Sequence, residues 1–214
     1  MDVLLAVIGA AIATALAVEL FAGWRDRKRL HAEIWAIAFG AYAVATWALA
    51  FGLAFGWTSV SFRTFYYLGA IANISLLAVG SVALWRERVA KRLLPVVNLW
   101  LVFGFFATFL APFVAPLPAD TVPEGSEVFD FTFMIEALTL PGPRLFAAIS
   151  GAVGSIVIIG FSLVSAVRSW RSNRRLAYGN ILIIGGVLVP AFGGSLTALG
   201  ESSALAISLA VGIT

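Results

Sequence analysis

Several polar side chains lie within or beside the long apolar stretches of this sequence, where they could bind a ligand or move a proton. Glu19 is the most deeply placed acid, about four residues, or ~6 Å of helix, from the end of its stretch. Carboxylates are costly in hydrocarbon and often mark ion or proton pathways. Asn98 and Asn180 fall at a similar depth in later stretches, and His31 and Glu33 stand at the mouth of another. These residues predict a polar pocket or a proton-accepting site open to one membrane surface.

A structural role explains the depth of Glu19 equally simply. An acidic side chain near the end of a span can reach the membrane surface and pair with a cation there. Arg25 and Arg175 are the candidates for that partner. The two interpretations therefore differ in whether the carboxylate is paired or free to bind.

A second polar group falls near the middle of the apolar stretches. Trp47, Asn73 and Trp100 are its principal members, with Tyr42 nearby. An amphipathic ligand pocket lined by these side chains is one interpretation. The other is that they form hydrogen bonds between helices, since a polar group in hydrocarbon must find a partner inside the protein.

The elements that carry these residues are apolar enough to be membrane helices. The chain of 214 residues is 61% hydrophobic and 12% charged, with a mean hydropathy of +1.00. Stretches of about 17–25 apolar residues match the thickness of the hydrocarbon layer. The sequence predicts an all-α, polytopic bundle of about seven transmembrane helices in one domain. The predicted spans are residues 3–23, 34–55, 65–85, 94–115, 145–167, 176–195 and 203–214.

Charge distribution predicts the orientation of the bundle. Lys and Arg number 14, and most of them form three groups that each follow an odd-numbered span. The groups are Arg25, Arg27, Lys28 and Arg29; Arg86, Arg88, Lys91 and Arg92; and Arg168, Arg171, Arg174 and Arg175. The positive-inside rule places these connections in the cytoplasm and the N-terminus outside. Topology also accounts for the basic pI of about 9.7, so we expect no nucleic-acid partner.

The segment 116–143 is the one long predicted loop, extracytoplasmic and acidic. It contains the alternating stretch "VFDFTF", which begins at Val128. A lid or a cation site is one interpretation, and a solvated loop that rests its phenylalanines on the headgroups is the other.

The last predicted span, 203–214, covers only ~18 Å of helix and is therefore too short to cross the bilayer. We expect the natural chain to continue past Thr214. Two prolines carry further predictions: Pro95 suits the first turn of its helix, and Pro190 should kink the sixth.

Enzymatic chemistry finds little support in the sequence. There is no cysteine and a single histidine, and neither a phosphate-binding loop nor a metalloprotease motif is present. The two lysines, Lys28 and Lys91, fall in connections, so a retinal Schiff base in the last helix is excluded. We therefore expect a protein that is not an enzyme and has no cofactor.

The stretches "WAIAFGAYAVATWALAFGLAFGW", "FRTFYYLGAIANISLLAVGSVALW" and "GGSLTALGESSALAISLAVGIT" carry a resemblance. They resemble uncharacterised seven-helix membrane proteins common in actinobacteria and, more distantly, the seven-helix N-terminal sensor region of certain histidine kinases. The resemblance implies a multi-pass protein of the bacterial cytoplasmic membrane that senses or binds a small ligand, with a signalling partner.

The alternative function is a small secondary transporter with a polar site around Glu19, Asn98 and Asn180. Two further features bear on assembly. The recurrence of Trp-Arg at residues 24, 85 and 170 reflects either an internal repeat or the interfacial preference of both residue types. Small residues at four-residue spacing, as in Gly9, Ala13 and Ala17, suit packing within one chain or a homo-oligomer.

Overall fold

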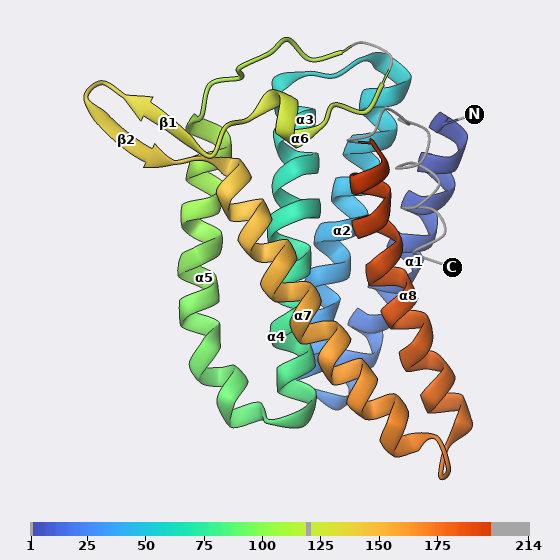
Figure 1. Cartoon of the computed structure of the whole chain (residues 1–214). Coiled ribbons are helices and arrows are strands. Elements are labelled where there is room, and N and C mark those ends of the chain that lie inside the picture. The colour runs from blue at the N-terminus through green and yellow to red at the C-terminus, as the bar shows by residue number, and fades with distance from the viewer. Residues whose placement is uncertain (1, 119–120, 198–214) are drawn as a thin grey trace.

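The computed structural model describes residues 2–118 and 121–197 (Figure 1). Side chains are described only as far as Leu188. The described chain is mostly helical, and five of its helical segments are long and apolar enough to cross a membrane. They are α1 (Asp2–Arg27), α2 (Leu30–Phe55), the continuous run of α3 (Ser59–Tyr66), η1 (Tyr67–Asn73) and α4 (Ile74–Trp85), α5 (Glu87–Leu110), and α7 (Pro143–Ser169). The sixth predicted span falls within α8 (Arg174–Thr197). The seventh, 203–214, lies outside the described residues.

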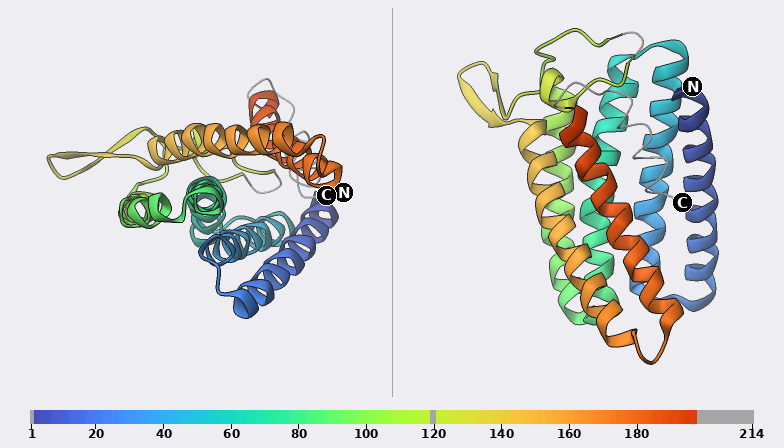
Figure 2. Two further views of the ribbon diagram at one scale, coloured as in Figure 1. Left: turned by 90° about the horizontal axis from the view of Figure 1, so that it is seen from below. Right: turned by 45° about the vertical axis from the view of Figure 1, so that its right-hand side comes forward.

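The helices form a row with a second layer across it. Helix α1 packs along α2, α2 packs along α3, η1 and α4, and α4 packs along α5. Helix α7 crosses η1 and α4, and α8 returns along α7 (Figures 1 and 2). The basic connections from α1 to α2, α4 to α5 and α7 to α8 lie at the same end (Figure 1). We call this the basic end and the opposite one the loop end.

The helices extend further into the basic connections than predicted. Helix α5 begins at Glu87, and Arg86 alone separates it from α4. An ion pair of 2.6 Å between Lys91 Nζ and Glu87 Oε1 lies in the first turns of α5 and supports that early start. Pro95 is therefore inside the helix, and its predicted first-turn position is wrong. Figure 1 shows the lower part of α5 bending toward α4, as expected of an internal proline.

A folded cap covers the loop end. After α5 the chain forms the short helix α6 (Gly125–Val128) and a hairpin of β1 (Thr132–Ile135) and β2 (Leu138–Pro141), which projects sideways from the bundle (Figure 1). Phe129 is fully buried and Phe133 nearly so, whereas Phe131 is exposed. The expectation that the phenylalanines of this loop rest on the headgroups is therefore wrong for two of the three. The described fold thus contains a small two-stranded sheet in addition to its helices.

Arg63 of α3 ties this cap to the bundle, a role that the sequence did not reveal. Its guanidinium donates hydrogen bonds to the carbonyl oxygens of Thr108 and, at 2.8 Å, Ala111. Both carbonyls belong to the C-terminal turn of α5, where backbone acceptors lack helical partners and a cation is favourable. The same guanidinium lies 4.3 Å from the centre of the Phe113 ring.

Candidate functional site

The structure places the first predicted group, Glu19, Asn98 and Asn180, on three separate surfaces. Glu19 is exposed on α1, and Asn98 is exposed on α5. These two helices lie at opposite ends of the row, with α2 and α4 between them (Figure 2). Among the described residues the one ion pair joins Lys91 and Glu87, so the carboxylate of Glu19 is not paired with either predicted arginine.

Asn180 is instead part of the contact between α7 and α8. Its side chain is buried, and Nδ2 donates hydrogen bonds to Ser165 Oγ at 3.0 Å and to the Leu176 carbonyl at 2.8 Å. This amide joins two helices within the bundle. The three residues thus do not converge on one pocket in the described structure.

The tryptophans of the second group also join helices. Trp47 Nε1 of α2 donates to Thr14 Oγ1 of α1 at 3.0 Å. Trp100 Nε1 of α5 donates to Ser150 Oγ of α7 at 2.9 Å, and its ring lies 4.5 Å from that of Phe146. These contacts fit the interpretation of the second group as hydrogen bonds between helices.

Asn73 differs from all of these residues, because its side-chain oxygen is buried and accepts no hydrogen bond. Oδ1 is the one fully buried side-chain polar atom without a partner in the part of the chain that the structure describes. Buried polar groups nearly always form a hydrogen bond. A buried donor or acceptor without one costs about 1–3 kcal/mol. Asn73 Oδ1 is therefore an acceptor without a donor in the described part of the chain.

The backbone around Asn73 is also unusual. Residues Tyr67–Asn73 form a π-helical segment of 7 residues between α3 and α4. Such wide turns are rare and frequently occur at functional sites. Helix α7 approaches closely just beyond the segment, because Gly154 has no side chain and packs directly against Ile74. A Cβ atom at Gly154 would lie 2.6 Å from Ile74 Cγ1, so a larger residue here would require Ile74 to move.

Helix α2 packs against η1 and α4. Two glycines of the η1 and α4 span lie against side chains of α2: Gly69 against Ala45, and Gly80 against Trp35. Because the two helices are antiparallel, these contacts fix their register and place Asn73 near the level of Tyr42. Asn73 follows Gly69 by four residues, and Tyr42 precedes Ala45 by three.

Tyr42 and Asn73 together could hold a small molecule with both donor and acceptor groups. The tyrosine hydroxyl can donate and accept, whereas the asparagine amide supplies both functions from separate atoms. Both residues belong to the second predicted group. The π-helix and the unsatisfied oxygen have no signal in the sequence that we can identify.

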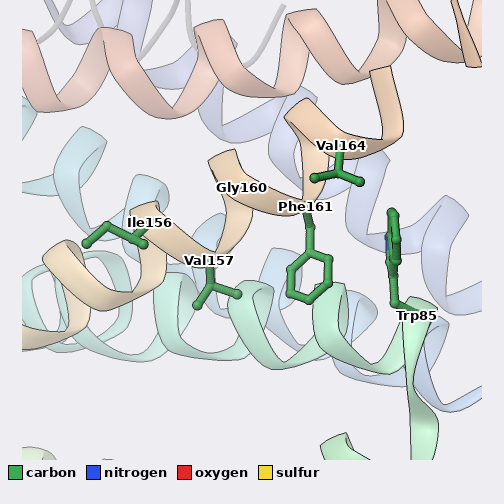
Figure 3. A pocket seen from close by; sticks show the side chains of 6 residues that line it. All are labelled: Trp85, Ile156, Val157, Gly160, Phe161 and Val164. Atoms are coloured by element: carbon green, nitrogen blue, oxygen red, sulfur yellow. The ribbon is translucent and has the colours of Figure 1, made fainter. Parts of the chain in front are cut away.

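Two grooves run along the basic half of α7. One lies toward α4 and has a volume of about 300 Å³, with Trp85, Gly160 and Phe161 in its lining (Figure 3). The other lies between α7 and α8, has a volume of about 460 Å³, and includes Arg168 and Arg171. Neither groove contains Asn73 or Tyr42. Among the described residues no group of three or more His, Cys, Asp or Glu side chains could hold a metal ion.

Comparisons with protein-family models, with curated proteins and with solved structures give no match. The function must therefore be argued from the geometry of the site.

Proposed function

We propose that the chain is a non-enzymatic sensory or small-ligand-binding module of the bacterial plasma membrane. Five long apolar helices support its location in a membrane. The gathering of basic connections at one end supports an orientation with that end in the cytoplasm and the N-terminus outside. We also propose that the chain crosses the membrane seven times and that α8 is the sixth of these spans.

The observation that carries the binding role is the buried, unpartnered Oδ1 of Asn73 within the π-helix. The proposed ligand is small and largely apolar, and it has a hydroxyl or amide N–H that donates to this oxygen. Tyr42, at the same level on α2, supplies the second polar contact. Apolar neighbours such as Ile71, which is fully buried, would surround the rest of such a ligand.

Binding at this position can be transmitted along the helix. A π-helical turn and a regular α-helical turn place the following residues at different rotations, so a ligand that favours one form shifts the population of the two. The next residue, Ile74, packs against Gly154 of α7, and α7 continues to the basic end. A change in η1 would therefore reach the side proposed to face the cytoplasm.

A secondary transporter built around Glu19, Asn98 and Asn180 finds less support. Such a site requires residues that converge on one pathway. The first two side chains are exposed on distant helices, and the third is engaged by Ser165.

The test compares two asparagines of the long apolar helices, one with a buried oxygen and one exposed. Asn73→Leu removes the proposed acceptor, and Asn98→Leu removes an exposed amide from α5 as a matched control. Each protein is purified in lipid nanodiscs and melted with a panel of small alcohols, phenols and amides. We expect compounds that raise the Tm of the wild type and of Asn98→Leu, with binding to Asn73→Leu about fivefold weaker or lost. A panel without any stabilising compound, or equal stabilisation of all three proteins, would contradict the proposal.

A further inference from the structure

The basic half of α7 has an apolar groove on each side and a cation between them. Figure 3 shows the first groove, where Ile156, Val157, Phe161 and Val164 of α7 line a surface that ends at the ring of Trp85. The second groove, between α7 and α8, is lined by Leu163, Val167 and Ile181 and ends at Arg168, Trp170 and Arg171. Both grooves are therefore apolar along the helix and end at aromatic or basic side chains.

Arg168 connects the two grooves. It lines the second groove, and its guanidinium lies 5.0 Å from the centre of the Trp85 ring, which lines the first. Among the described residues, Lys91 and Glu87 form the one ion pair. Arg168 and Arg171 therefore have no carboxylate partner in that part of the chain. Two positive charges thus lie beside apolar surface at the end of a membrane helix.

This combination matches the chemistry of an anionic phospholipid. A phosphate group binds best to arginine, which supplies several N–H donors in a planar fork. Acyl chains require an apolar surface that runs along the helix, and both grooves provide one. Trp85 and Trp170 have the amphipathic rings typical of the headgroup level, and basic pockets between membrane helices are known to bind lipid headgroups.

We propose that Arg168 and Arg171 bind the phosphate of an anionic phospholipid whose acyl chains lie in the two grooves along α7. The lipid would cover the part of α7 that neither α4 nor α8 covers. It would also hold the hairpin of α7 and α8 against the rest of the bundle, because α8 packs chiefly on α7. The inference does not depend on the ligand proposed for Asn73.

Gly160 gives a way to test the groove without changing a charge. A Cβ atom at this position would meet no other atom within 4 Å, and Gly160 lines the first groove, so a side chain placed here begins in open space. Gly23 of α1 has equally open surroundings and serves as the matched control. Gly160→Leu should therefore compete with an acyl chain, whereas Gly23→Leu should not.

The experiment measures lipid binding to the full chain by native mass spectrometry, with phosphatidylglycerol, cardiolipin or phosphatidylcholine added to the protein in detergent. We expect both anionic lipids to bind more tightly than phosphatidylcholine. The double variant Arg168→Gln and Arg171→Gln should weaken this binding about 30-fold, and Gly160→Leu severalfold. The control pair Arg25→Gln and Arg27→Gln removes the same charge from α1 and should change it less than threefold.

Three outcomes would overturn the proposal. Equal binding of phosphatidylcholine would show that the grooves accept any lipid. An equal loss in the Arg25 and Arg27 control would show general attraction to a basic surface. Inorganic phosphate that displaces the lipid at millimolar concentration, together with unchanged binding in Gly160→Leu, would show an anion site without acyl-chain recognition. Circular dichroism of each variant establishes that it retains its helices.

Discussion

The loop end and the basic end of this bundle are built in different ways. At the loop end, aromatic side chains of α3, of the segment after α5 and of the residues just after α6 pack into one buried cluster around Phe62 and Phe129. Arg63 donates hydrogen bonds to backbone carbonyls at the end of α5, and Trp57 donates one of 2.9 Å to the Thr121 carbonyl of the cap. At the basic end, two open grooves flank α7, and Arg168 is exposed.

The difference indicates where each end obtains its stability. The loop end supplies its own partners, since side chains and carbonyls from distant parts of the chain satisfy one another. Beside α7, the basic end leaves apolar surface and the charges of Arg168 and Arg171 without a carboxylate partner in the described chain, which suits a surface completed by lipid. Mutations should therefore reduce the intrinsic stability much more in the aromatic cluster of the loop end than in these two grooves.

The largest expected effect comes from the aromatic cluster. Phe129 is fully buried, and its ring centre lies 5.1 Å from Tyr66 and 5.4 Å from Phe113. Phe129→Ala should lower the free energy of unfolding by about 3–5 kcal/mol, because it leaves a cavity. Phe161→Ala in the first groove should cost clearly less, since the groove is already open. Equilibrium unfolding by SDS in bicelles measures both, and equal losses would contradict the comparison.

The next effect concerns Arg63. Arg63→Met keeps a long, unbranched side chain and removes its donors, so the carbonyls of Thr108 and Ala111 lose their partner. We expect a loss of about 2–3 kcal/mol and faster amide hydrogen exchange in residues 111–118. Arg168→Met at the basic end is the matched control and should change the stability in detergent by less than about 0.5 kcal/mol. Unchanged exchange in the cap of Arg63→Met would contradict its role as a tie.

A smaller effect is expected at Gly142, where the hairpin joins α7. A Cβ atom there would lie 2.2 Å from the Asp130 carbonyl oxygen, and backbone atoms move less easily than a flexible side chain. Gly142→Ala should therefore cost about 1–3 kcal/mol. Gly151→Ala on α7, where the added Cβ meets nothing within 4 Å, should stay within about 0.5 kcal/mol. A similar Tm for the two variants would show that the cap adapts to the added methyl group.

Five of the predicted spans correspond to helices that are long and apolar enough to cross a membrane, because apolar length is a local property. The predicted span 145–167 and the observed α7 differ by two residues at each end. The predicted ends failed where charged residues continue a helix, as at Glu87, since composition marks the hydrocarbon boundary and not the end of the hydrogen-bonded helix. Pro95 was misplaced for the same reason.

The sites were harder to predict because they depend on pairings across the chain. Arg63 binds carbonyls that are 45 and 48 residues away, and carbonyl oxygens have no signature in a sequence. Similar depth grouped Glu19 with Asn98, but depth does not say which way a side chain faces or which helices are neighbours. Tyr42 and Asn73 do lie on neighbouring elements, because α2 packs along η1.

The smallest expected effect tests the attachment of α8. Asn180 and Ser165 form a hydrogen bond of 3.0 Å between α8 and α7, near the basic end. Such bonds contribute on average only about 0.6 kcal/mol in membrane proteins, because the separated helices find other partners. A double-mutant cycle of Asn180→Ala and Ser165→Ala should give a coupling energy of that size in detergent. A coupling above about 2 kcal/mol would show that the basic end, like the loop end, is held firmly by its own side chains.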